Sequence, residues 1–283
     1  MDGFNLKSVY TVAKKEFLDN IRNKWIILLT IIFILLIIVF SYVAGGQTGE
    51  DTFGNMQNTV FGLLGISSLL IPLIAIILGF STISGEAESG ALYVVLSYPI
   101  RRIEVLFGKL LGLGSVISFS ILIGFGLGGI IIAATVGLDY IKGYLGFIIL
   151  SIFLGFIYLS LAICISSYCK RRITSIGGGI VIFFWGMIYG TVLIAVMFGA
   201  GYSMEDFMAG NIPDWFFNSV VFSPGDLYQT AVQRAFGVTS IDAMGFSVRI
   251  PDFLSMTTLI IVHIIWFVIP LVLAYYFFRK RDI

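Results

Sequence analysis

The chain has 283 residues, of which 58% are hydrophobic and only 12% are charged, with a formal net charge of +1. Its mean hydropathy is +1.02, whereas a soluble domain of this size carries about 25% charged residues. The 26 Phe and 13 Tyr exclude a disordered chain, because disordered chains are poor in aromatic residues. The composition therefore predicts an integral membrane protein.

Residues 1–24 precede the first long apolar run and predict a helix lying along the membrane surface. Apolar residues recur in this leader at three- and four-residue intervals: Leu6, Val9, Tyr10, Ala13, Phe17 and Ile21. Basic residues occupy its other faces: Lys7, Lys14, Lys15 and Arg22. This pattern is typical of an interfacial amphipathic helix whose basic side chains face anionic lipid. The alternative is a partly ordered basic tail.

Six apolar segments are each long enough to cross a bilayer core about 30 Å thick, which needs roughly 20 helical residues. They are Trp25–Ala44, Thr59–Ile83, Leu110–Gly137, Tyr144–Tyr168, Ile173–Gly199 and Met256–Phe278. None contains Asp, Glu, Lys or Arg, which are costly at mid-membrane. An outer-membrane barrel would show alternating strands of about ten residues instead. The predicted fold class is therefore all-α, with six transmembrane helices in a single domain over residues 1–283.

Basic residues in the connections indicate the orientation of these spans. Fourteen of the 17 fall on one side of the predicted membrane: Lys7, Lys14, Lys15, Arg22, Lys24, Arg101, Arg102, Lys109, Lys170, Arg171, Arg172, Arg279, Lys280 and Arg281. The other side has only Lys142, Arg234 and Arg249. Because basic residues collect in cytoplasmic loops, we expect a multi-pass protein of the cytoplasmic membrane with both termini in the cytoplasm.

Small and polar residues inside the spans are best explained by helix packing. Glycine pairs four residues apart let helices approach closely: Gly108 and Gly112, Gly124 and Gly128, and Gly186 and Gly190. Cys164 and Cys169 lack the spacing of a metal or redox motif. His263 is the single histidine, which excludes a multi-histidine metal site. A hydrogen bond to a neighbouring helix is the favoured role for it, over a proton relay.

The longest connection, residues 200–255, is predicted to lie outside the cell. It holds several acidic and aromatic residues: Glu205, Asp206, Asp214, Asp226, Asp242, Asp252, Trp215, Phe216, Phe217 and Phe222. A loop of this length is expected to contain short helices, some resting in the outer interface where aromatic rings favour the headgroup level. Its acidity follows from the lack of basic residues on this side and does not require a cation site.

The cytoplasmic connection between spans two and three, residues 79–112, carries the most informative pattern. Apolar residues follow helical spacing between Glu86 and Ser97: Ala87, Ala91, Leu92, Val95 and Leu96. Pro99 ends this predicted helix, because the ring pushes the preceding residue away from helical angles. The apolar stripe has no evident partner within the chain, so we expect it to dock on another protein. For Glu86 and Glu88, two pairings stay open: basic residues of that partner, or basic residues of this chain, namely Arg101, Arg102 or lipid-facing ones.

This stretch resembles the signature of type-2 ABC exporter permeases, roughly G-E-x-E-x-G-T-L-x-x-L-L-S-x-P-I-S-R followed by G-K-x-x-G. The matching residues are Gly85, Glu86, Glu88, Gly90, Leu92, Leu96, Ser97, Pro99, Ile100, Arg102, Gly108, Lys109 and Gly112. The sequence departs from the pattern at Ala91 and Arg101, where the family often has Thr and Ser. Residues 223–228 are similar to the N-P-x-D/E-x-F/Y-R segment of the permeases of the nitrous-oxide-reductase maturation type. The residues of this external motif are Ser223, Pro224, Asp226 and Tyr228.

The resemblance implies the transmembrane subunit of an ABC exporter, powered by a separate cytoplasmic ATPase subunit. The chain has no G-x-x-x-x-G-K-[ST] phosphate loop, since Leu110 follows Gly108-Lys109 where a hydroxyl is needed. It is therefore not itself an enzyme; it binds no cofactor or metal, and ATP and Mg belong to the partner. The helix between Glu86 and Ser97 would be the coupling helix. Its implied interface residues are Glu86, Glu88, Gly90, Leu92, Val95, Leu96, Ser97, Pro99, Arg101 and Arg102.

Other expected partners are the lipid bilayer, a second permease copy (the same chain or a related one) and an extracytoplasmic accessory protein, but no nucleic acid. An alternative function is a non-transporting module that transmits ATPase-driven force or a signal to the extracytoplasmic partner, which suits the large external segment. Substrate-stimulated ATPase activity would favour the exporter over this module. An ion-coupled secondary transporter is disfavoured because the spans carry no carboxylates.

Overall fold

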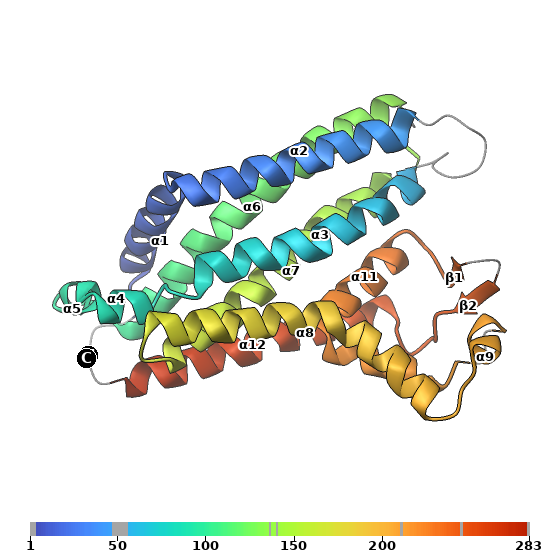
Figure 1. Ribbon diagram of the computed structural model, residues 1–283. Helices are drawn as coiled ribbons and strands as arrows, with labels where there is room; N and C mark the ends of the chain where they lie inside the picture. Colours follow the sequence, from blue (N-terminus) through green and yellow to red (C-terminus); the bar gives the residue numbers. More distant parts are fainter. Residues whose placement is uncertain are drawn as a thin grey trace.

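Six long helices form the body of the molecule in the computed structural model, which describes residues 4–46, 56–135, 137–139, 141–209, 212–243 and 246–281. All six are long and apolar enough to cross a membrane: α2 (Lys24–Gly46), α3 (Met56–Gly79), α6 (Arg102–Thr135), α7 (Ile141–Tyr168), α8 (Arg172–Gly199) and α12 (Met256–Lys280). They run along one long axis (Figure 1). The predicted all-α membrane fold with six spans is confirmed.

Helices α6 and α7 form the centre of the bundle. Helix α6 packs against α2, while α7 packs against α3, α6 and α12. The rings of Phe125 on α6 and Phe147 on α7 meet with centroids 4.5 Å apart, and both are fully buried. Helix α8 contributes least to this core, since Ile180, Val181 and Ile188 are exposed along it. Its apolar surface is therefore available to lipid or to another membrane protein.

Helix α6 is longer than the sequence predicted. It begins at Arg102, eight residues before the expected start of the third span, and has 34 residues. At 1.5 Å per residue it is about 51 Å long, well beyond a hydrocarbon core of about 30 Å. No helix-breaking residue separates Arg102 from Leu110, and Glu104 in the first turn favours the helix N-terminus. The charged start of α6 therefore projects beyond the membrane-spanning part.

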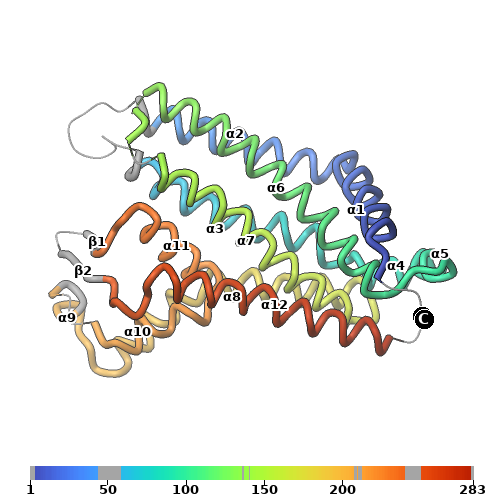
Figure 2. The backbone as a smooth tube through the Cα atoms, turned by 180° about the vertical axis from the view of Figure 1, so that it is seen from behind, coloured from blue at the N-terminus to red at the C-terminus, as the bar shows by residue number. Residues whose placement is uncertain are grey.

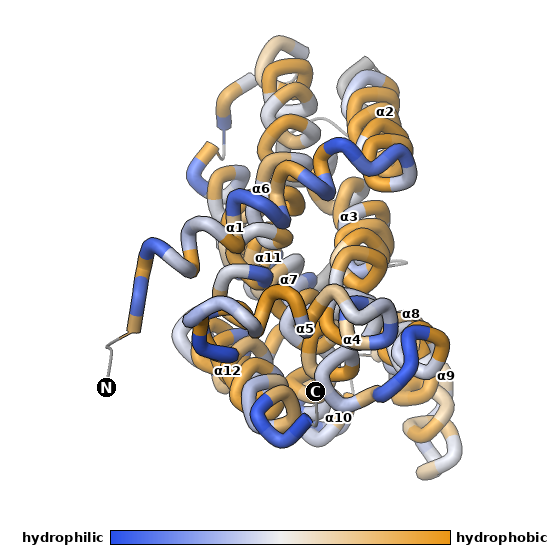
Figure 3. The backbone as a smooth tube through the Cα atoms, turned by 90° about the vertical axis from the view of Figure 1, so that its left-hand side faces the viewer, coloured by the Kyte–Doolittle hydropathy of each residue, from blue (hydrophilic) through white to orange (hydrophobic). Residues whose placement is uncertain are grey.

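One end of the bundle gathers α1 (Leu6–Ile21), α4 (Ser84–Glu88), α5 (Ala91–Leu96), the α7–α8 turn and the C-terminal end of α12. We call it the basic end, because the fourteen basic residues named above belong to these elements and to the starts of α2, α6 and α8. Figure 3 looks at this end and shows hydrophilic segments around the apolar helices. The predicted single helix from Glu86 to Ser97 is wrong. Gly90, with a left-handed φ of 78°, breaks it into α4 and α5.

The opposite end contains α9 (Met204–Met208), α10 (Asp214–Asn218), the 3-10 helix η1 (Ser219–Phe222) and α11 (Pro224–Ala235). The expected short helices are thus present. A two-stranded antiparallel hairpin, β1 (Ser240–Ala243) and β2 (Phe246–Arg249), was not predicted. That some of these short helices rest in the outer membrane interface stays a prediction, but α11 is not one of them. It lies among α3, α7, α8 and α12 (Figure 2).

The two ends of the bundle can be assigned to the two sides of the membrane by cysteine labelling. In a variant lacking Cys164 and Cys169, we expect an impermeant maleimide to label Lys142→Cys and Glu205→Cys on intact cells, because both positions are exposed at the end opposite the basic one. Arg171→Cys, exposed at the basic end, should react only after permeabilisation. Labelling of Arg171→Cys on intact cells would overturn the orientation.

Candidate coupling site at the basic end

Helix α1 is seated in a groove on α6 made by two glycines. A Cβ atom at Gly108 would lie 2.6 Å from Cβ of Val12, and one at Gly112 would lie 2.5 Å from the carbonyl oxygen of Ala13. Real Cβ atoms do not approach other atoms so closely, so only glycine at both positions allows this contact. The G-x-x-x-G pair therefore packs two helices of the same chain.

The face that α1 turns toward α6 is only partly the predicted apolar face. Val9 is buried there as expected, but so are Val12 and Glu16, whereas Leu6 and Tyr10 are exposed. One face of α1 therefore packs on α6, and another face exposes an apolar strip that includes Leu6 and Tyr10. That this strip lies in the membrane interface stays a prediction.

Lys109 joins three elements of the basic end. Its ammonium nitrogen lies 2.8 Å from Oε1 of Glu16 on α1 and 2.7 Å from Oε1 of Glu86 on α4. The Lys109 side chain, from α6, is only 2% exposed. Removing such a charge from water is costly unless opposite charges and hydrogen bonds compensate. The two carboxylates supply that compensation, so α1, α4 and α6 are locked to one another through one cation.

Lys15 completes this charge cluster from its outer side. Its ammonium nitrogen lies 3.5 Å from Glu16, 3.6 Å from Asp19 and 3.7 Å from Glu86. Partial burial opposes the charge on Lys15, but the three carboxylates outweigh that effect and raise the pKa of its ammonium group. Lys15 therefore stays protonated at neutral pH, and the two lysines balance Glu16 and Glu86.

A second buried carboxylate, Glu104, connects the beginnings of α1 and α6. Its Oε1 accepts the backbone N–H of Asn5 at 2.7 Å, and its Oε2 accepts that of Arg101 at 3.1 Å. Each amide belongs to the residue just before a helix. Free amides at helix N-termini favour anionic acceptors. Sequence analysis missed Glu104, although its position three residues after Arg101 matches the spacing of a capping box.

Two arginines brace the ends of the long helices. Arg102 donates from Nη1 to the carbonyl oxygens of Phe278, Arg279 and Arg281 at the end of α12. Arg281 in turn donates to the carbonyl oxygens that end α7: Ser166, Ser167, Cys169 and Lys170. Cations are favourable at helix C-termini, where carbonyl groups lack partners. The contacts link α6 to α12 and α12 to α7.

The sequence left the partners of Glu86 and Glu88 open, and in the structure both side chains contact groups of this chain. Glu86 binds Lys109 and Lys15, so of the two open pairings the one within this chain holds for it, with lysines in place of Arg101 and Arg102. Glu88 Oε2 accepts the backbone N–H of Arg172 at 2.7 Å, at the first turn of α8. Neither pairs with a side chain of Arg101 or Arg102 among the described residues. The short α4 is consequently tied to α6 by one acidic side chain and to α8 by the other.

The expectation that the apolar stripe lacks a partner in the chain is wrong for Leu92. This side chain is fully buried in the chain's own core, and Val95 and Leu96 are partly buried against it. A Cβ atom at Gly90 would have no described atom within 4 Å, so its left-handed φ, rather than close packing, requires glycine. Of the other named residues, Ser97, Pro99 and Arg101 are exposed.

The outward face of this element is instead formed by residues that sequence analysis did not name. Tyr93, Val94 and Tyr98 are each more than half exposed at the tip of the basic end. Tyr93 and Val94 fall between the positions of the predicted stripe, because Leu92, Val95 and Leu96 keep helical spacing and turn that stripe inward. We call Tyr93, Val94 and Tyr98 the tip face.

The external motif lies inside the bundle, at the start of α11. Ser223 caps the helix by accepting the backbone N–H of Asp226, and Pro224 occupies its first turn, where a proline is favourable. The fully buried hydroxyl of Tyr228 lies 3.1 Å from Oγ of Ser67 on α3 and 2.8 Å from Oγ of Ser151 on α7. Ser151 is ten residues into α7, about 15 Å from its end. The motif therefore fixes α11 near mid-depth.

Asp226 enters the bundle with α11. Its neighbour Gly225 approaches the carbonyl oxygen of Gly186 on α8 and the hydroxyl of Tyr158 on α7. Oδ2 of Asp226 is buried without a hydrogen-bond partner among the described residues. The spans themselves carry no mid-membrane carboxylate, but the inserted helix brings one in.

His263 was expected to bond to a neighbouring helix, but its Nδ1 lies 2.7 Å from the Leu259 carbonyl of its own helix.

The described residues contain no group of three or more His, Cys, Asp or Glu that could hold a metal ion. A second pair of glycines on α6 also serves packing within the chain, as expected. Cβ atoms at Gly124 and Gly128 of α6 would meet Ile37 of α2 at 3.1 and 2.7 Å. These features, with six spans and a braced basic end, define a polytopic α-helical membrane protein.

Comparison with known proteins gives the family. A family model described as "ABC-2 family transporter protein" matches residues 10–283, and the chain belongs to this family. A "Probable ABC transporter permease protein NosY" from Pseudomonas aeruginosa is 29% identical over 284 residues, covering 97% of this chain and 99% of the relative. The protein of the same name from Stutzerimonas stutzeri is 27% identical over 285 residues, covering 98% and 99%. The resemblance found in the sequence is confirmed.

Replacing Lys109 by Met should destabilise the folded permease by about 3 kcal/mol, at the lower end of the cost of breaking a buried ion pair, because Lys15 partly compensates. The measurement is thermal unfolding of the purified protein in detergent. The exposed Lys14→Met is the matched control and should change stability by less than about 0.5 kcal/mol. Adding Glu16→Gln to Lys109→Met should recover part of the loss. Equal melting of Lys109→Met and wild type would contradict the locking role.

Tyr228→Phe should lower stability by roughly 0.6–1.7 kcal/mol, the range measured for hydrogen bonds between helices in membranes. The ring remains, so only the contacts to Ser67 and Ser151 are lost. Tyr98→Phe, which removes an exposed hydroxyl, is the control and should melt like wild type. If the two variants melt alike, the hydroxyl of Tyr228 does not hold α11 in the bundle.

Proposed function

We propose that this chain is the transmembrane permease subunit of an ABC exporter and that a separate cytoplasmic ATPase subunit docks on its basic end. The observation that carries the proposal is the tip face of Tyr93, Val94 and Tyr98. It exposes apolar side chains on a short element whose base is fixed by buried ion pairs. Burying a large apolar side chain contributes roughly 1.5–3 kcal/mol, which favours a protein partner at this surface.

The braces around the tip face suit the transmission of force. A displacement of α4 acts on α6 through Glu86 and Lys109, and on α8 through Glu88. The same end of α6 holds α12 through Arg102. Because buried ion pairs and capping contacts resist separation, an ATPase that moved the α4–α5 element would move several spans together. ATP and Mg would be bound by that subunit.

A second permease copy would complete the membrane part of the complex. Helix α8 supports this step, because its apolar residues Val181, Phe184 and Ile188 are exposed along much of its length. The named relatives are described as ABC transporter permeases. We extend that role to this chain, with export as the direction and the cytoplasmic membrane as the location. The elements from α9 to β2 would face an extracytoplasmic accessory protein.

The docking role of the tip face is tested by co-purifying the ATPase subunit with the permease from native membranes. Val94→Glu should abolish co-purification while the permease still inserts and folds, because Val94 is exposed and outside the spans. Val94→Thr, of the same shape and without charge, should retain it. Leu92→Glu should instead unfold the element, since Leu92 is fully buried.

The backbone at Gly90 offers an independent pair of variants for the same assay. Gly90→Asn should keep ATPase binding, because Asn tolerates the left-handed conformation, whereas Gly90→Val should weaken it. Full ATPase binding and full ATP-dependent activity in Val94→Glu would show that the tip face is not the coupling contact.

A further inference from the structure

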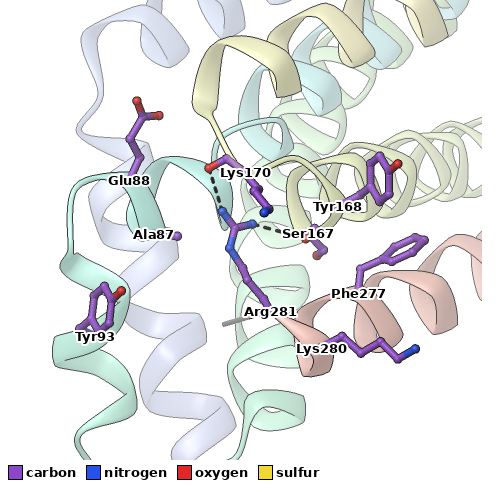
Figure 4. A pocket seen from close by; sticks show the side chains of 9 residues that line it. All are labelled: Ala87, Glu88, Tyr93, Ser167, Tyr168, Lys170, Phe277, Lys280 and Arg281. Atoms are coloured by element: carbon purple, nitrogen blue, oxygen red, sulfur yellow. Dashed lines mark hydrogen bonds between the residues drawn. The ribbon is translucent and has the colours of Figure 1, made fainter. Parts of the chain in front are cut away.

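A cavity of about 380 Å³ opens at the basic end between α4–α5, the end of α7 and the end of α12. It is separate from the Lys109 cluster, which lies between α1, α4 and α6. Figure 4 shows the residues that line it: Ala87, Glu88, Tyr93, Ser167, Tyr168, Lys170, Phe277, Lys280 and Arg281. Of the residues that line the cavity, the helix-end contacts described above involve one cation, Arg281, and none of the aromatic rings.

The cavity is strongly cationic. The Arg281 guanidinium is fixed by the carbonyl oxygens at the end of α7, so its charge has a constant position beside Lys170 (Figure 4). The Lys170 ammonium has no partner among the residues that the structure describes, and Lys280 extends outward at the rim. Glu88 is the one carboxylate in the lining, and one of its oxygens is already engaged by the α8 backbone. An anion would meet the Lys170 ammonium beside one fixed positive charge. The ammonium of Lys280 donates to the hydroxyl of Tyr276 at 2.5 Å, so it would exchange that contact for the anion.

Below these cations the cavity wall is aromatic. The exposed ring of Tyr168 lies against Phe277, with centroids 5.0 Å apart, and Lys280 lies 4.3 Å over the ring of Tyr276. The apolar surface continues along α12 through the exposed Val272 and Leu273. Aromatic rings between an apolar span and a cluster of lysines mark the headgroup level of a membrane. The cavity therefore lies at the depth where the phosphate group of a membrane lipid joins its acyl chains.

We propose that this cavity binds the phosphodiester headgroup of an anionic glycerophospholipid of the adjoining leaflet. Lys170 and Lys280 bind the phosphate beside the fixed charge of Arg281, while Tyr168 and Phe277 contact the glycerol and the first methylenes. A basic pocket between spans at a membrane surface suits such a headgroup. The continuity with the lipid-facing side of α12 favours a lipid over an acidic segment of a protein. Tyr93 belongs to both this cavity and the tip face, but the lipid contacts proposed here come from α7 and α12 and do not require ATPase docking.

The test uses the full-length permease in nanodiscs that contain phosphatidylglycerol and phosphatidylcholine. Native mass spectrometry after progressive delipidation measures how much phosphatidylglycerol remains bound. Wild type should retain phosphatidylglycerol in preference to phosphatidylcholine, and Lys170→Gln/Lys280→Gln should lose about tenfold or more of that retention. Both lysines are exposed, so the variant should fold, which its melting temperature checks. Arg101→Gln/Arg171→Gln removes the same charge from exposed positions at the same end and should retain the lipid.

Four results would overturn the proposal, the last of them in a separate arm of the experiment. One is equal retention by wild type and Lys170→Gln/Lys280→Gln. Another is an equal loss in the control, which would indicate only general attraction to the basic end. The third is loss of ATPase co-purification by the variant while its phosphatidylglycerol retention is unchanged, which would assign the cavity to an acidic protein segment. Inorganic phosphate, added in a separate arm, should not displace the lipid; displacement would assign the site to free phosphate.

Discussion

The basic end depends on the burial of Lys109 between Glu16 and Glu86. A buried cation with two carboxylates is not a strong source of net stability, because desolvation offsets most of the attraction. Its effect is on geometry: any separation of α1, α4 or α6 would leave an uncompensated charge away from water. The fit of α1 over Gly108 and Gly112 places Glu16 within reach, so packing and charge specify the same arrangement. The caps at Arg102 and Arg281 then extend it to α12 and α7.

The sequence predicts those parts of the structure that follow from the bilayer itself. Apolar length and the distribution of Lys and Arg were enough for the six spans, because lipid imposes both patterns along a single helix. The family signature located the basic end, but not which of its residues face outward. Helical spacing put Leu92 and Tyr93 on different faces, but it did not say which face turns toward the chain's own core, and the structure buries Leu92 and exposes Tyr93. The partners of Glu86 lie on two other helices, so no local pattern names them.

The external motif is a second case in which the sequence predicts an element but not its contacts. Ser223 and Pro224 predict a helix start, which is correct, but capping chemistry is the same on a surface as in a membrane. Helix α11 buries Leu227, Ala231 and Val232 in the core. The hydroxyl of Tyr228 meets those of Ser67 and Ser151 at mid-depth. Because serines are common in membrane spans, the sequence does not show which residue forms a hydrogen bond with each of them. The polar residues of a loop and those of two spans become one interior network only in three dimensions.

The distance along the chain between Glu16 and Lys109 has a consequence for biogenesis. Their hydrogen bond joins residues 93 positions apart, so at about 5–20 residues per second the first partner leaves the ribosome roughly 5–20 s before the second. During that interval α1 has neither its glycine groove nor its cation, and two spans must insert before α6 supplies them. The exposed apolar strip with Leu6 and Tyr10 would hold the newly made helix at the lipid surface until α6 is present. Seating of α1 therefore has to follow the synthesis of α6, even though α1 is the first helix to be made.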